Sequence, residues 1–150
     1  MSHHVCCVMD AQFFVSNGKD VFREFSFVSK NEINCMQVDP GFLAISDAKT
    51  NWFIQKLITG LGYRPRKCYF NQNNIRPYIK KLYKRASSID KPLVAVYNNQ
   101  LCDILKELNI PHYDCPIESS CNWLCNFHHE NKESHKCALN KSLRLYKALQ

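Results

Sequence analysis

The chain has 150 residues, of which 45% are hydrophobic and 22% charged, a composition typical of a globular protein and not of a disordered or fibrous one. No run approaches the roughly 18 apolar residues of a membrane-spanning helix. The start, MSHHVCCVMDAQFF, lacks the basic and long apolar regions of a secretory signal. We therefore expect a single domain over residues 1–150, in the cytoplasm or nucleus, neither secreted nor bound to a membrane.

Three runs in the first part of the chain have the composition of β-strands. The turn SNGKD at 16–20 precedes a run of alternating polarity, and the third run ends at the turn DPG. Asp10 directly follows the first run, and QFFV then leads into the turn. The sequence predicts an antiparallel meander of three strands: residues 3–9, 21–29 and 33–38.

The remainder of the chain alternates between helical and strand patterns. The clearest helix covers 74–87, where Ile75, Ile79, Leu82 and Ala86 form an apolar stripe. The other predicted elements are a helix at 47–62, a strand at 91–97, a helix at 100–109, a strand at 110–116 and a helix at 138–149. This order predicts an α/β, ribonuclease H-like fold, with a mixed sheet that opens with an antiparallel three-strand meander and is flanked by helices.

The positive charge is concentrated in one segment. The net charge is +7, yet residues 48–89 contain ten basic and no acidic residues, while the rest of the chain has ten basic and thirteen acidic ones. Such asymmetry is typical of proteins that bind a polyanion, and Tyr63 and Tyr69 beside the sequence RPRK could stack on bases. The predicted nucleic-acid-binding residues are Arg64, Arg66, Lys67, Arg76, Lys80, Lys81, Lys84 and Arg85.

Cysteine and histidine are concentrated near the end of the chain, in CNFHHENKESHKCAL at 125–139. Cys125, His128 and Cys137 lie within 13 residues, a spacing from which three side chains can reach one Zn²⁺ ion. Spacing alone favours Cys121 as the fourth ligand. The alternatives left open are Cys115, His129, His135 and a distant carboxylate. By contrast, the scattered cysteines have apolar neighbours and are predicted to fill the core: Cys6, Cys7, Cys35, Cys68 and Cys102.

The stretch CNFHHENKESHKCAL resembles the C-terminal part of the Maelstrom domain, whose pattern is Glu…Cys-x2-His…Cys followed by Ala-Leu and a terminal helix. FREFSFVS…INCMQVDPG is similar to the opening strands of that family, and LVAVYNNQLCDILKELNI to its central strand and following helix. The resemblance covers roughly residues 21–150. On this alignment, VMDAQFF before the matched region would add an edge strand.

The resemblance implies a ribonuclease H-like domain related to DEDD-type exonucleases, in which a Glu-Cys-His-Cys zinc site replaces the catalytic acids. It places the zinc ligands at Glu24, Cys125, His128 and Cys137, with one structural Zn²⁺ per chain. It also implies binding of single-stranded RNA, a role in small-RNA (piRNA) silencing, and protein partners in a ribonucleoprotein complex. The alternative functions are a single-strand RNA endonuclease and a protein-interaction scaffold.

Two-metal nuclease chemistry needs several carboxylates around two ions, and the sequence lacks most of them. In place of the Asp-x-Glu of the first strand it has Asp10 and Gln12, and in place of the middle acid it has Cys102, with Asp103 one residue late. Lys136 and Lys141 occupy the positions of the last motif. We therefore expect no two-metal exonuclease activity. His112, His129 and His135 are acid or base candidates only in the weak sense that histidine is the side chain ordinarily suited to proton transfer near neutral pH.

Overall fold

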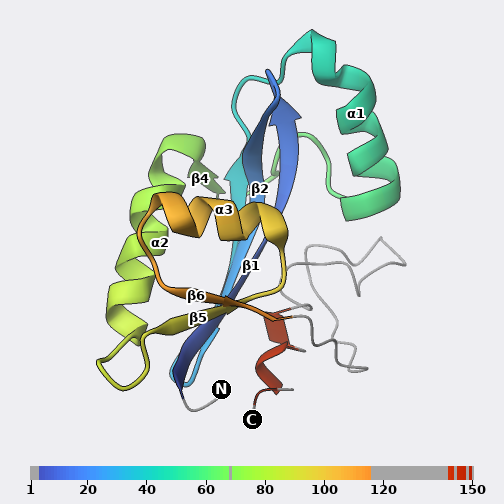
Figure 1. Cartoon of the computed structure of the whole chain (residues 1–150). Helices are drawn as coiled ribbons and strands as arrows, with labels where there is room; N and C mark the ends of the chain where they lie inside the picture. The colour runs from blue at the N-terminus through green and yellow to red at the C-terminus, as the bar shows by residue number, and fades with distance from the viewer. Residues whose placement is uncertain (1–3, 68, 116–141, 144, 148, 150) are drawn as a thin grey trace.

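A computed structural model describes residues 4–67, 69–115, 142, 143, 145–147 and 149, and shows an α/β arrangement with one six-stranded mixed sheet and helices on both sides (Figure 1). The strands are β1 (Val5–Ser16), β2 (Lys19–Ser29), β3 (Ile33–Asp39), β4 (Tyr69–Asn71), β5 (Leu93–Val96) and β6 (His112–Asp114). The helical elements are the 3₁₀ turn η2 (Ile45–Asp47), α1 (Ala48–Phe53), the π-helical turn η3 (Ile54–Thr59), α2 (Gln72–Ala86) and α3 (Asn99–Glu107).

The strand order is β4-β3-β2-β1-β5-β6. β1, β2 and β3 pair antiparallel, as the meander prediction requires, whereas β5 is parallel to β1, β6 to β5 and β4 to β3. The sheet is therefore mixed, as predicted. The short strand β4 was not predicted, because its three residues are too few to give a periodic pattern.

β1 differs from the prediction in length and in position. It continues through Asp10 to Ser16, because Asp10 and Gln12 face the second side of the sheet while their neighbours fill the core. Asn17 and Gly18, both with positive φ, close the hairpin to β2 in the two-residue turn that suits twisted strands. The expectation that residues 8–14 add an edge strand is wrong: β1 pairs with β2 on one side and with β5 on the other.

The main core lies between one face of the sheet and the helices α2 and α3. β1 contributes the alternate residues Cys7, Met9, Ala11 and Phe13 to this face. The predicted stripe of α2 is confirmed, since Ile75, Ile79 and Leu82 are fully buried and Ala86 packs against the same cluster. α3 adds Leu101, Cys102, Ile104 and Leu105.

A β-bulge in β2 moves Arg23 away from the core side of the sheet. Gln12 pairs with Glu24, but the next residue of β1, Phe13, pairs with Phe22, so Arg23 is the extra residue of β2. Regular alternation would put Arg23 on the core side together with Phe25. The bulge instead gives that position to Phe22, whose ring centroid lies 6.3 Å from that of Phe25.

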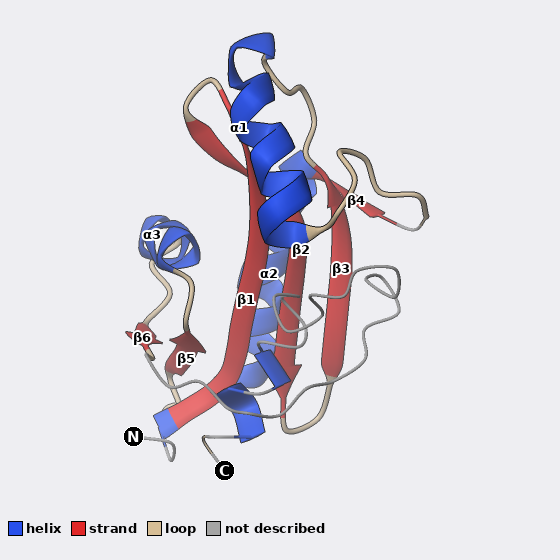
Figure 2. Cartoon of the chain, turned by 90° about the vertical axis from the view of Figure 1, so that its right-hand side faces the viewer, coloured by secondary structure: helices blue, strands red, loops and turns tan. Residues whose placement is uncertain are grey.

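The second face of the sheet carries other elements. Figure 2 shows α1 and the C-terminal helical residues in front of the sheet, with α2 behind it. Val8, Ala95, Cys115 and Leu145 form a small apolar cluster on this side. The strongly polar residues of β1 and β2 therefore lie between α1 and the end of the chain.

Asn51 of α1 takes the place of a neighbouring strand at the end of β1. Its amide group donates to the carbonyl of Val15 and accepts from the Val15 N–H, both at 2.8 Å. Asn51→Ala is expected to lower the free energy of unfolding by about 1–3 kcal/mol, because two backbone groups of β1 lose their partner. Urea denaturation measures this effect. Asn73→Ala, at an exposed position of α2, is the matched control and should change the stability by less than about 0.5 kcal/mol.

Candidate functional site

A row of five polar side chains lies on the second face of the sheet, contributed by three adjacent strands. Glu24 pairs with Gln12 on one side and with Gln37 on the other, and Asp10 pairs with Ser26 one step along the sheet. All five residues are at most 5% exposed. Because paired residues of neighbouring strands point to the same side, the two carboxyl groups, the two amides and the hydroxyl face one buried region.

Arg23 joins two residues of this row, Gln37 and Glu24, in a chain of hydrogen bonds. The Arg23 Nη1 donates to Gln37 Oε1 at 2.5 Å, and Gln37 Nε2 donates to Glu24 Oε2 at 2.9 Å. Arg23 Nε also donates to the carbonyl of Gly62 at 2.8 Å. Burial lowers the pKa of the Arg23 guanidinium, while the negative charges of Glu24 and Asp39 act in the opposite direction. The bulge thus brings a buried cation to the polar face.

The C-terminal part of the chain contacts the polar face through Ser142. Its hydroxyl oxygen lies 2.5 Å from that of Ser26, which is two residues after Glu24 on the same strand. At the other end of residues 116–141, Cys115 is buried beside Val8, which lies on the same side of β1 as Asp10. The described residues on either side of the Cys/His cluster, Cys115 and Ser142, therefore both lie at the face that holds Glu24.

Of the four predicted zinc ligands, the structure describes Glu24. Cys125, His128 and Cys137 lie outside the described residues, as do the alternatives Cys121, His129 and His135. Among the residues that the structure describes, no group of three or more His, Cys, Asp or Glu could hold an ion. The described part nevertheless fits a ligand role for Glu24. Its carboxylate is buried, one oxygen accepts a hydrogen bond from Gln37, and Ser142 anchors the chain five residues beyond Cys137.

The nuclease motif positions that the structure describes do not converge. Asp10 and Gln12 lie in the polar row, where Asp10 Oδ1 accepts the Ala11 N–H at 2.8 Å. Cys102 is buried in the core on the opposite side of the sheet, and Asp103 is exposed on α3. Lys136 and Lys141 lie outside the described residues. His112 is half-buried, and its Nδ1 lies 2.9 Å from the carbonyl oxygen of Ile110.

Three of the eight predicted nucleic-acid-binding residues form ion pairs within the protein. Arg64 pairs with Asp39 at 2.8 Å, Arg85 with Glu32 at 2.5 Å and Arg76 with Glu107 at 3.9 Å. The Arg76 guanidinium also lies over the Phe22 ring, 5.7 Å from its centroid. These three arginines connect α2 and the loop before β4 to the rest of the fold.

The other five predicted residues are exposed and make no ion pair with the described part of the chain: Arg66, Lys67, Lys80, Lys81 and Lys84. We call them the basic edge. Arg66 and Lys67 precede β4, which leads directly into α2, and the three lysines lie on the solvent side of α2 opposite its buried stripe. The basic edge thus runs from the loop along α2.

The aromatic residues near the basic edge differ in accessibility. The Tyr63 ring packs on Phe14 with centroids 5.4 Å apart, and Tyr78 packs on Phe70 at 4.7 Å. Tyr69 is 50% exposed. Of the two tyrosines predicted to stack on bases, Tyr69 therefore has the more accessible ring.

Sequence analysis missed Arg23, Ser26 and Gln37 of the polar face. Ser26 alternates with Glu24 along the apolar strand β2, which was a signal for a shared face, whereas Arg23 breaks this alternation and is placed only by the pairing of β2 with β1. None of the helices in the described residues is both long enough and apolar enough to cross a membrane. Comparison of the chain with family models, with curated proteins and with solved structures finds no match.

Proposed function

We propose that this chain is a zinc-stabilised, ribonuclease H-like module that binds single-stranded RNA and has lost two-metal catalysis. The observation that carries the RNA-binding part is the basic edge, where five exposed cations follow a loop and a helix without an acidic residue among them. Surfaces that only keep a protein soluble usually mix charges of both signs. A one-sign surface along a helix suits a phosphate backbone.

The strand order supports the ribonuclease H-like part of the proposal. Three antiparallel strands, β1 to β3, are followed by β5 and β6 parallel to β1, with α2 and α3 in the connections. This is the order expected from the sequence for that fold. A role in small-RNA silencing rests on the resemblance to the Maelstrom domain alone.

The surroundings of the two buried carboxyl groups argue against two-metal hydrolysis. Asp10 and Glu24 share the polar face, but Gln12 and Gln37 beside them are neutral amides, and Arg23 brings a cation to the same chain of hydrogen bonds. Two-metal hydrolysis needs several carboxylates around two ions, and the row of five polar side chains supplies only those of Asp10 and Glu24. A zinc site with four protein ligands would likewise have no open position for an activated water.

Salt dependence tests the RNA-binding proposal. If the basic edge supplies five phosphate contacts, affinity for a single-stranded oligonucleotide should fall about 100-fold between 50 and 200 mM salt. Fluorescence anisotropy with a labelled oligouridine measures this. Affinity that does not depend on salt would contradict the proposal. Absence of binding would favour the protein-interaction scaffold, and cleavage by the purified monomer that survives chelation would favour the endonuclease.

Two lysines of α2 give a sharper test. Lys80→Gln combined with Lys84→Gln removes two of the five contacts, so affinity should become less salt-dependent, with a fall of about 20-fold over the same range. Lys19→Gln combined with Lys106→Gln changes the net charge equally, at exposed positions outside the basic edge. If both double variants weaken binding to the same extent, the effect comes from net charge and not from the basic edge.

A further inference from the structure

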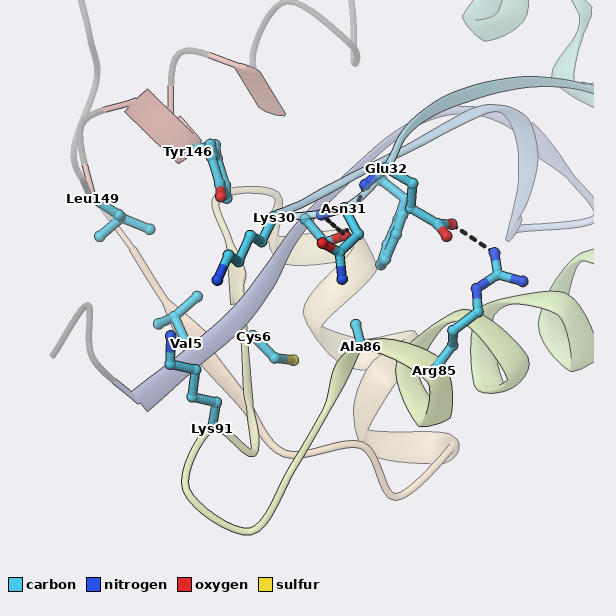
Figure 3. Close-up of a pocket in the computed structure, with 12 residues that line it drawn as sticks. Val5, Cys6, Lys30, Asn31, Glu32, Arg85, Ala86, Lys91, Tyr146 and Leu149 are labelled. Atoms are coloured by element: carbon cyan, nitrogen blue, oxygen red, sulfur yellow. Dashed lines mark hydrogen bonds and ion pairs between the residues drawn. The ribbon is translucent and has the colours of Figure 1, made fainter.

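A cavity of about 440 Å³ opens where the lower end of the sheet meets α2 and the end of the chain (Figure 3). Its walls come from the start of β1, the turn between β2 and β3, the last turn of α2, the loop before β5 and the C-terminal helical residues. This volume falls within the range of small-molecule sites. Glu24, the one predicted zinc ligand that the structure describes, does not line it.

One part of the cavity wall is apolar. Val5 of β1 and Phe27 of β2 line it, together with Tyr146 and Leu149 from the end of the chain. Figure 3 shows Tyr146 and Leu149 on the same side of the cavity. Phe27 is 1% exposed, so the half-buried ring of Tyr146 is the aromatic surface of this wall on which a planar ligand can stack.

The rim of the cavity is positively charged. Lys30, Lys91 and Arg85 line it, and Glu32 is the acidic residue among the lining residues. Arg85 already pairs with Glu32 at 2.5 Å, whereas neither lysine makes an ion pair with the described residues. Both ammonium groups are therefore available to an anionic ligand.

Polar groups of the turn between β2 and β3 complete the lining. The Ser29 hydroxyl oxygen accepts the N–H groups of Asn31 and Glu32, each at 3.3 Å, which leaves its proton to be donated. The Asn31 side chain, which also lines the cavity, has both donor and acceptor atoms. An alkyl carboxylate would leave these polar groups against methylene carbons, whereas the edge of a nucleobase can pair with them.

We propose that this cavity binds one nucleotide, with its base against Tyr146 and its phosphate between Lys30 and Lys91. The inference rests on the proposed RNA-binding function and adds a defined subsite to it. Arg85 lines the cavity and lies one helical turn after Lys81 of the basic edge, so a strand that follows α2 reaches the cavity at the end of the helix. The nucleotide in the cavity is then one nucleotide of the single strand that follows α2.

Adenosine 5′-monophosphate is the first probe, with isothermal titration calorimetry as the measurement. We expect it to bind more tightly than adenosine, which lacks the phosphate contacts, and more tightly than inorganic phosphate, which lacks the base contacts. Lys91→Gln should weaken its binding at least about tenfold through loss of a charge-assisted hydrogen bond. Lys106→Gln, on the exposed side of α3, should leave binding unchanged. Equal binding to wild type and Lys91→Gln, or binding of octanoate in place of the nucleotide, would overturn the proposal.

Cys6 reports on the position of the bound nucleotide. It lines the cavity, and its sulfur lies 3.6 Å from that of Cys7, whose hydrogen bond lowers the pKa of Cys6. Bound nucleotide should therefore slow alkylation of Cys6 by iodoacetamide, followed by mass spectrometry of the peptide. Binding without protection of Cys6 would show that the nucleotide lies elsewhere and would overturn the assignment to this cavity.

The same variants separate this proposal from the proposed function. If Lys80→Gln with Lys84→Gln weakens oligonucleotide binding while Lys91→Gln changes neither oligonucleotide nor mononucleotide affinity, the RNA-binding function stands and the cavity proposal is wrong. If wild type binds the mononucleotide through Lys91 but binds no oligonucleotide, the cavity proposal stands and RNA binding is wrong.

Discussion

If Glu24 is a ligand of the proposed zinc site, Glu24→Ala is expected to abolish zinc binding and to lower the free energy of unfolding by several kcal/mol. The carboxylate is buried on the polar face, and structural zinc contributes about 10–16 kcal/mol of apparent binding energy in small zinc-dependent folds at neutral pH. Mass spectrometry of the metal content should find one zinc per chain in wild type and none in the variant. Thermal unfolding with and without a chelator gives the accompanying loss of stability.

Two further variants separate the zinc effect from other effects of the substitution. Glu24→Gln keeps the volume of the side chain and an oxygen that can accept from Gln37, but removes the charge, so it should also lose zinc. Cys121→Ala should retain one ion per chain. Loss of zinc with Cys121→Ala and retention with Glu24→Ala would instead indicate a local zinc finger. Wild type without zinc would make the proposed metal site wrong.

Arg23→Met is expected to lower the free energy of unfolding by about 1–3 kcal/mol, the range for leaving a buried hydrogen-bond acceptor without its donor. Arg23 is 4% exposed, and its guanidinium hydrogen-bonds both Gln37 and the carbonyl of Gly62. Without it, the buried oxygen of Gln37 and the partly buried carbonyl of Gly62 lose their donor, and Glu24 loses the attraction of a neighbouring cation. Urea denaturation at one fixed zinc concentration measures the change.

The matched control for this substitution is Arg66→Met. Arg66 is an exposed arginine of the basic edge, so the same chemical change should alter the free energy of unfolding by less than about 0.5 kcal/mol. It should also weaken RNA binding, which Arg23→Met should not do in the folded protein. A change below about 1 kcal/mol for Arg23→Met would show that the bulge does not depend on its guanidinium.

Elements with a regular apolar pattern were predictable from the sequence. The stripe of α2 and the alternation of β2 and β3 give elements within a few residues of those observed. α1 with η3 likewise covers most of the helix predicted at 47–62. The predicted first strand ended too early, because a charged residue such as Asp10 indicates the end of a strand when the second face of the sheet is assumed to be exposed to solvent. Here that face is buried, and a polar residue can continue the strand.

The candidate site was harder to predict, because its features depend on contacts between distant residues. Residues 48–89 have no acid of their own, yet Asp39, Glu32 and Glu107 from outside this segment neutralise three of its arginines. Composition alone therefore overstated the number of cations without an acidic partner. The bulge at Arg23 was equally hidden, since an extra residue in a strand is visible only against its partner strand.

The position of β1 between β2 and β5 has a consequence for how the chain folds. The hairpin from β1 to β2 closes over two residues, but the parallel partner of Val5 is Leu93, 88 residues later. Local contacts form faster than distant ones, so the hairpin should form while the other edge of β1 is still without its partner. During synthesis the β5-facing edge of β1 therefore remains unpaired until β5 has been made. The nascent chain is most prone to aggregation in this interval, before Leu93 has left the ribosome.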